Sequence, residues 1–99
     1  MLRITVEEQE NLTTLRLEGK LKGDWVPELE RCWMRTRSAD PNRHLMIDLA
    51  AVSFVDENGK LLLKNLASQH AELLAVGNPL MRLLVNDIAG RAAAKHVAK

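Results

Sequence analysis

Tyrosine is absent from this 99-residue sequence, and only two tryptophans and one phenylalanine represent the aromatic residues. So few aromatic side chains provide no stacking platform for nucleic-acid bases. A formal net charge of +1 is also too balanced to predict nucleic acid as the main partner. Cysteine occurs once, at Cys32, so the chain can form no internal disulfide and no zinc site built on cysteine alone.

Long hydrophobic runs are also missing. No run approaches the roughly 20 residues that a membrane-spanning helix needs. The first residues, Met1–Ile4, alternate apolar and polar side chains and lack the apolar core of a signal peptide. The five glycines are dispersed, so no glycine-rich loop is available to cradle a phosphate. We therefore expect a cytoplasmic protein with no cofactor and no direct insertion into a membrane.

The residues that are present have the composition of one globular domain. Hydrophobic residues make up 46% of the chain and charged residues 27%, which argues against disorder. Leu2, Ile4 and Val6 alternate with polar residues, the period of a half-buried strand. The alternation resumes over residues 13–17, so the pattern predicts an N-terminal hairpin whose second strand ends or bulges at Gly19.

Helical periodicity follows the hairpin. Asp24 is predicted to cap a first helix, which has this apolar face: Val26, Leu29, Cys32 and Trp33. A second helix is expected to start near Asp56–Asn58 and to bury Leu62, Leu63, Leu66 and Ala67. A third is expected to have Asn78 as its N-cap and Pro79 as its first residue. Its predicted apolar stripe is Leu80, Leu83, Leu84 and Ile88.

Two short apolar segments, residues 45–47 and 73–76, predict buried strands, and residues 48–55 are expected to carry the chain off the sheet edge. The resulting order is β-β-α-β-α-β-α. It predicts a single α/β domain with a mixed, mostly parallel sheet of about four strands and about three helices. We expect this domain to span residues 1–89. The basic, alanine-rich Gly90–Lys99 would form a C-terminal tail or extend the third helix.

The middle of the chain resembles a known family. It contains Ile47-Asp48-Leu49, then Val52-Ser53-Phe54-Val55-Asp56, and then Gly59 ahead of a leucine-rich helix. This motif is similar to that of the STAS family, which comprises the anti-sigma-factor antagonists and the cytosolic domains of sulfate transporters. Residues 2–19 look like the opening hairpin of the family, and residues 45–76 look like its central β-α-β unit. The resemblance implies a STAS-like fold over almost the whole chain.

The resemblance also singles out Asn58. In the antagonists, the position before this glycine is a serine or threonine that is phosphorylated by a partner kinase, which doubles as an anti-sigma factor. A phosphate adds about −1.5 to −2 charges at an interface beside a helix N-terminus, so it blocks or reorganises docking. Asparagine has no hydroxyl group. We therefore expect that Asn58 is not phosphorylated and that the chain lacks the usual switch.

The predicted contact surface combines this turn with the loop before the first helix. Asp56 and Asn58 can satisfy free N–H groups at the helix start, and Glu57 adds a permanent negative charge there. Trp25 is a candidate binding anchor, although packing is the commoner role of such a residue. The residues expected to contact a protein partner are Asp24, Trp25, Phe54, Asp56, Glu57, Asn58, Gly59 and Lys60.

Two other kinds of chemistry have weaker support. Asp24, Asp56 and Glu57 could in principle hold a divalent cation or a small ligand, but no metal-binding or phosphate-binding motif accompanies them, so no metal is predicted. Cys32 could pair with a histidine as a nucleophile, because folding can bring distant residues together. It lies on the predicted apolar face, however, where cysteine behaves as a small core residue. We therefore expect no enzymatic activity.

The sequence thus predicts a non-enzymatic protein–protein interaction module that resembles an anti-sigma-factor antagonist. Its expected partner is an anti-sigma factor or a related serine-kinase-like regulator. One alternative is an accessory subunit docked on the cytosolic part of a membrane transporter of the ABC type. Another is a small-ligand sensor that uses Asp24, Asp56 and Glu57. A phosphate found at Ser53 or Ser68 would contradict the idea of a binder without a switch.

Overall fold

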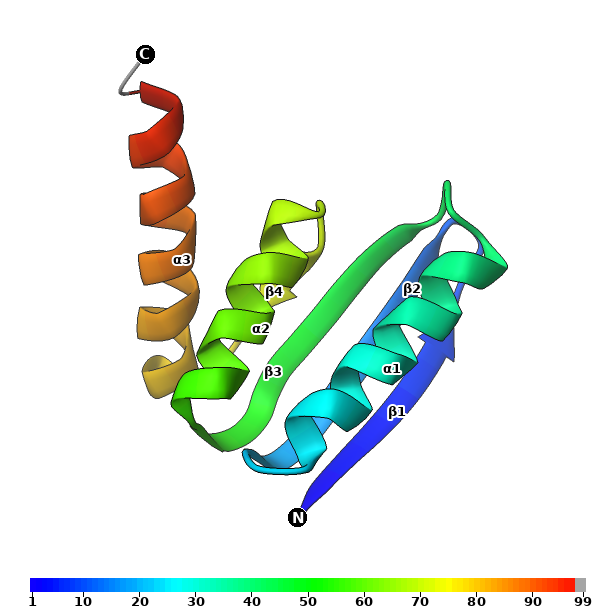
Figure 1. Cartoon of the computed structure of the whole chain (residues 1–99), viewed down its shortest axis with the longest axis horizontal. Helices are drawn as coiled ribbons and strands as arrows, with labels where there is room; N and C mark the ends of the chain where they lie inside the picture. Colours follow the sequence, from blue (N-terminus) through cyan, green and yellow to red (C-terminus); the bar gives the residue numbers. More distant parts are fainter. Residues whose placement is uncertain (98–99) are drawn as a thin grey trace.

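The strands of this protein form one mixed sheet. The computed structural model describes the backbone of residues 1–97 and the side chains of residues 1–88. The elements follow the order β1 (Leu2–Glu8), β2 (Leu12–Leu21), α1 (Trp25–Ala39), β3 (His44–Val55), α2 (Glu57–Ser68), β4 (Glu72–Leu74) and α3 (Pro79–Val97). The sheet order is β1-β2-β3-β4; β1 is antiparallel to β2, and the other neighbours are parallel (Figure 1). The predicted α/β fold is confirmed.

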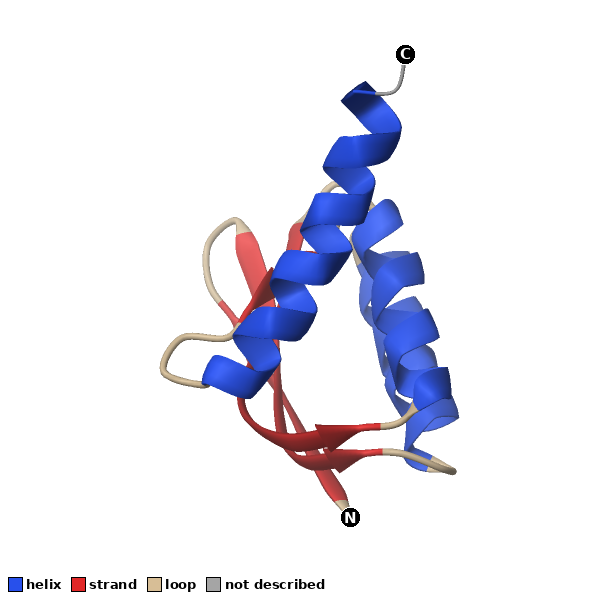
Figure 2. Cartoon of the chain, turned by 90° about the vertical axis from the view of Figure 1, so that its left-hand side faces the viewer, coloured by secondary structure: helices blue, strands red, loops and turns tan. Residues whose placement is uncertain are grey.

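One face of the sheet is covered by α1 and α2, which stand on the same side of the strands in Figure 2, one behind the other, and contact each other. The core between these layers is formed mainly by leucines, including Leu15, Leu17, Leu21, Leu29, Leu45, Leu63 and Leu66. Cys32 is buried in the same core, as its helical spacing predicts. Helix α3 packs against β3, β4 and α2. Within the part of the chain that the structure describes, no helix is long and apolar enough to cross a membrane.

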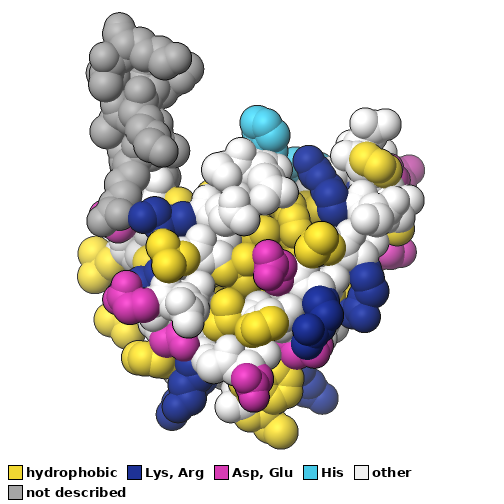
Figure 3. Space-filling view, viewed as in Figure 1, with side chains coloured by type: hydrophobic (Ala, Val, Ile, Leu, Met, Phe, Trp, Pro, Cys, Tyr) yellow, Lys and Arg dark blue, Asp and Glu magenta, His cyan; other side chains and the backbone are white. Residues whose placement is uncertain are grey.

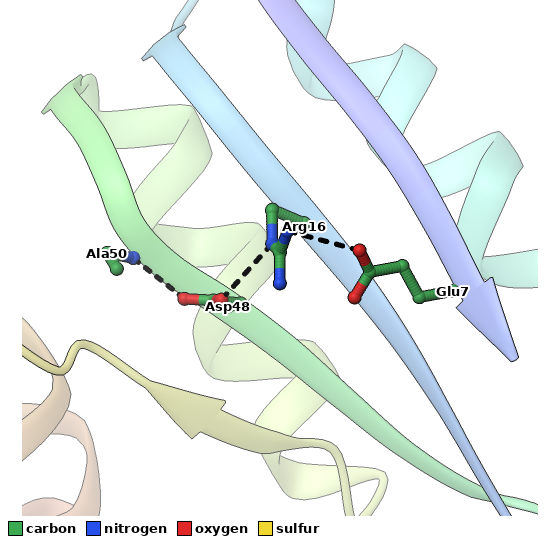
Figure 4. A network of polar contacts seen from close by, with 4 residues as sticks. All are labelled: Glu7, Arg16, Asp48 and Ala50. Atoms are coloured by element: carbon green, nitrogen blue, oxygen red, sulfur yellow. Dashed lines mark hydrogen bonds and ion pairs between the residues drawn. The ribbon is translucent and has the colours of Figure 1, made fainter. Parts of the chain in front are cut away.

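The opposite face of the sheet carries polar side chains, three of which form a network across β1, β2 and β3 (Figure 4). Arg16 Nη1 lies 3.1 Å from Glu7 Oε2, and Arg16 Nε lies 3.5 Å from Asp48 Oδ2. The second Asp48 oxygen accepts a hydrogen bond of 2.9 Å from the Ala50 N–H. Exposed ion pairs contribute only about 0–1 kcal/mol to stability. The Asp48–Ala50 hydrogen bond lies at the point where the pairing of β3 with β2 becomes irregular.

Strand β3 is longer than the sequence predicts. Residues 48–55 are expected to leave the sheet, but they remain paired with β2 as far as Val55. The register between β3 and β2 shifts twice in this stretch, as it does at β-bulges. The buried side chains therefore fall at Leu49, Val52 and Val55, three residues apart instead of two. The period of two that identifies a strand is lost here, so the sequence pattern of this segment is typical of a connection.

The apolar stripe predicted for α3 is partly wrong. Ile88 is buried as predicted, but Leu80 and Leu83 are 62% and 69% exposed, and Met81 is buried instead. Apolar residues occur on nearly every side of the first two turns, so periodicity does not select one face. The helix also continues beyond Gly90, which is one of the two outcomes expected for the C-terminal residues. The two exposed leucines, Leu80 and Leu83, lie next to the candidate functional site.

Candidate functional site

Asp56 joins the end of β3 to the start of α2 and holds a neighbouring loop. Its Oδ1 accepts a hydrogen bond of 2.7 Å from the Gly59 N–H, so Asp56 caps α2 as predicted. Its Oδ2 accepts a bond of 2.9 Å from the N–H of Gly23, in the loop between β2 and α1. The Asp56 N–H donates to the Leu21 carbonyl at 3.1 Å. Three backbone segments are thus fixed by one residue.

These bonds also set the ionisation of Asp56. The N–H groups of Gly23 and, second, Gly59 stabilise the carboxylate and hold the pKa of Asp56 below its ordinary value of 3.8. Both oxygens of this carboxylate are engaged with backbone groups. Among the residues that the structure describes, no group of three or more His, Cys, Asp or Glu side chains is placed to hold a metal ion. The geometry indicates a structural clamp.

Asp24 and Trp25 both lie at the start of α1, where Asp24 lacks the predicted capping bond and Trp25 has the packing role that the sequence favours. Asp24 occupies the N-cap position of α1, but its side chain makes no capping hydrogen bond. Its backbone is already helical, at φ −66° and ψ −14°, whereas the capping residue Asp56 is extended, at φ −81° and ψ 179°. Trp25 packs against the core and lines a shallow depression with Leu2 and Ile4 of β1. It therefore has the packing role, on the β1 side of α1.

Glu57 and Asn58 form the exposed tip of the turn. The Glu57 side chain is 88% exposed, and its Oε1 lies 3.5 Å from Lys60 Nζ. Asn58 is exposed, whereas Gly59 is buried beneath it. A Cβ atom at Gly59 would lie 2.8 Å from a methyl carbon of Val55 and 3.0 Å from a backbone oxygen of β2. Gly59 is thus required for close packing beneath the turn, and the neighbouring side chains are available for contact.

An apolar groove begins beside this turn and lies between α2 and α3. Its volume is about 600 Å³. Four exposed large hydrophobic side chains line it: Phe54 (47% exposed), Leu61 (59%), Leu80 (62%) and Leu83 (69%). Figure 3 shows hydrophobic side chains gathered at the lower left of the molecule, where α2 and α3 begin in Figure 1. Glu57 and Lys60 line the groove as well as the turn.

Of the four exposed hydrophobic residues that line this groove, the sequence predicts only Phe54 as a site residue. A signal was available for Leu61, because it falls outside the helical spacing of the buried leucines of α2, Leu62, Leu63 and Leu66. No comparable signal distinguishes Leu80 and Leu83 from their buried neighbours in α3. Their exposure depends on how that helix is rotated against β3.

The match to a family model covers most of the chain. The model of the STAS domain matches residues 3–73. A comparison with curated proteins found no significant match. The family match includes the hairpin, α1, β3, the Asp56 turn and α2.

Solved structures with the same fold include two anti-sigma-factor antagonists. The anti-sigma factor antagonist SpoIIAA in its unphosphorylated form is 20% identical, with a TM-score of 0.58 over 83% of this chain and 80% of that chain. An antisigma-factor antagonist STAS domain from Rhodobacter sphaeroides is 18% identical, with a TM-score of 0.52 over 77% of this chain and 86% of that chain. A structure of Mglu is 18% identical, with a TM-score of 0.57 over 73% of this chain but only 19% of that chain.

Proposed function

Because this chain belongs to the STAS domain family, we propose that it is a non-enzymatic protein-binding module of the anti-sigma-factor antagonist type. The observation that carries this proposal is the exposed tip Glu57–Asn58, presented at the N-terminus of α2 by the Asp56 clamp. The proposed partner is an anti-sigma factor or a related serine-kinase-like regulator. Support for the type of partner comes from the family and from the two antagonists that share the fold.

The turn is suited to docking because it is already ordered. Asp56 bonds to Gly23 and to Gly59, so the loop before α1 and the start of α2 keep a fixed relative position. A surface that is preorganised loses little conformational entropy when a partner binds. The contact surface proposed here comprises the exposed Asp24, Glu57, Asn58 and Lys60.

Binding is proposed to be constitutive, because position 58 has no phosphoacceptor. Asn58 is exposed but carries no hydroxyl group. The two hydroxyls nearest to position 58 along the sequence both donate hydrogen bonds: Ser53 Oγ to the Gly19 carbonyl at 3.3 Å, and Ser68 Oγ to a carbonyl at the far end of α2. Control by abundance or by competition between binders replaces control by phosphorylation in this proposal.

The test combines binding and phosphorylation. The full chain is titrated calorimetrically with purified kinase-type regulators from the same cell, with and without ATP, and its mass is then measured. We expect unchanged mass and ATP-independent binding for the wild type. When ATP is present, the Asn58→Ser variant should gain one phosphate and lose binding to the regulator. Asn65→Ser, at another exposed position of α2, is the matched control and should behave as the wild type.

Two outcomes would contradict the proposal. One is a phosphate on the wild-type chain at Ser53 or Ser68 that changes binding. The other is the absence of binding to any such regulator. Recovery of the chain with the cytosolic part of a membrane transporter would instead favour the role of an accessory subunit.

A further inference from the structure

The groove between α2 and α3 exposes large apolar side chains, and the hydrogen bonds of the Asp56 turn do not explain this exposure. Single exposed hydrophobic residues are normal on a protein surface, but a contiguous patch marks a binding site. Here the patch draws on three elements: Phe54 from the end of β3, Leu61 from α2, and Leu80 and Leu83 from α3. Segments that are distant in the sequence therefore build one apolar surface.

The outward orientation of the α3 leucines is fixed by specific contacts. Asn78 Oδ1 accepts a hydrogen bond of 3.2 Å from the Met81 N–H, and Asn78 Nδ2 donates to carbonyls of β3. These bonds set the rotation of α3 so that Met81 and Ile88 enter the core. Leu80 and Leu83 must then face outward. Their exposure is a defined feature of the fold, not the result of a loosely packed helix.

The shape of the groove favours a helix over a small molecule. Small-molecule sites enclose roughly 70–90% of their ligand. The side chains that line this groove most openly are themselves about half exposed or more, so they form a trough with an open side. An amphipathic helix fills such a trough with apolar residues at positions i, i+4 and i+7 and keeps its polar face in water.

Charge on the α2 side of the groove defines the occupant further. Lys60 and Lys64 lie four residues apart, so they project from the same face of α2. Among residues with described side chains, Lys60 has one exposed ion pair, to Glu57, and Lys64 has none. Asp87 lines the α3 side. Carboxylates on a docked helix would therefore face α2, and such pairs set orientation and partner choice more than affinity.

We propose that this groove binds an acidic amphipathic helix of a protein partner. Its apolar edge packs among Phe54, Leu61 and Leu83, and its carboxylates face Lys60 and Lys64. The inference rests on the proposed function in taking the occupant to be a protein. It adds a second contact surface, which is continuous with the turn because Glu57 and Lys60 line both.

Two synthetic peptides test the inference directly. Each has about 16 residues with leucines at i, i+4 and i+7, and the flanking positions are glutamate in one and lysine in the other. Fluorescence anisotropy measures their binding to the full chain. The acidic peptide should bind, and Leu83→Asp should reduce its affinity at least about tenfold. Met34→Asp is the matched control, since Met34 is 59% exposed on α1 outside the groove.

Further variants separate the apolar and charge requirements. Leu61→Asp should weaken binding of the acidic peptide as Leu83→Asp does, so the conclusion does not depend on the folding of one variant. Far-UV circular dichroism checks that both variants are folded. Lys64→Glu should shift the preference from the glutamate peptide toward the lysine peptide. The preference should also diminish at high salt, because exposed charges are screened.

Three results would overturn the inference. These are no binding of either peptide, unchanged binding by Leu83→Asp, and a groove filled by a second copy, seen as a wild-type dimer that Leu83→Asp converts to a monomer in sedimentation. The proposed function fails differently. In that case no kinase-type regulator binds the chain, while the acidic peptide still does.

Discussion

Asn78 ties the start of α3 to strand β3, and its replacement by alanine should destabilise the fold measurably. Its Nδ2 lies 3.3, 3.0 and 2.8 Å from the carbonyl oxygens of Leu49, Ala50 and Val52. Its Oδ1 accepts the Met81 N–H at 3.2 Å. Strand β4 pairs with β3 only as far as residue 48, so the Asn78 amide serves these carbonyls where the parallel ladder has ended.

The expected loss for Asn78→Ala follows from these contacts. Removing an N-cap side chain costs about 1 kcal/mol. Carbonyls left without their donor cost about 1–2 kcal/mol more, since Leu49 is fully buried. The sum, about 2–3 kcal/mol, corresponds to a decrease in Tm of about 10–20 °C for a domain of this size. Urea unfolding followed by far-UV circular dichroism and tryptophan fluorescence measures the loss in free energy of unfolding.

Two further substitutions separate the two contributions. Asn78→Ser retains an acceptor for the Met81 N–H but loses the amide donors, so an intermediate loss of about 1–2 kcal/mol is expected. Asn78→Asp also retains the cap, but it places a carboxylate oxygen among carbonyl oxygens. It should destabilise at least as much as alanine does, although aspartate is a good capping residue. Wild-type stability of Asn78→Asp would refute the role assigned to the carbonyl contacts.

Three more predictions concern backbone geometry and ionisation. His70 lies two residues after the end of α2, with φ 73° and its N–H bonded to the Ala67 carbonyl. His70→Gly should therefore raise stability by about 0.5–1 kcal/mol in urea unfolding, and a loss would contradict this. Gly19→Ala should cost about 2–4 kcal/mol by the same assay, because Gly19 has φ 107° and an added Cβ would lie 2.4 Å from the Met1 carbonyl oxygen; a neutral effect would be inconsistent with that contact. The pKa of Asp56 is lower when folded, so its stabilisation is present above its ordinary value of 3.8 and is lost as pH falls through the folded pKa. Thermal unfolding against pH should therefore show the wild type approaching Asp56→Asn in acid, and a constant difference would argue against the clamp.

Local patterns were sufficient for much of the fold. Alternation identified β1 and β2, and helical spacing identified the buried faces of α1 and α2. Asp56 and Asn78 were predicted as caps because their side chains and the residues that follow them are typical of helix starts. The motif around Gly59 led to the correct family. Each of these features depends on residues close together in the chain.

Other features were decided only by contacts between distant segments. Local residue patterns are enough to predict the α/β architecture, the family and the position of the Asp56 turn. The tertiary structure decided that residues 48–55 stay in β3, because neighbouring β2 still pairs with them through two register shifts. It also decided that Leu80 and Leu83 face outward, because Asn78 bonds to carbonyls more than 25 residues earlier and thereby sets the rotation of α3. Periodicity reports which residues share a face, but only packing against the rest of the chain determines which face is buried.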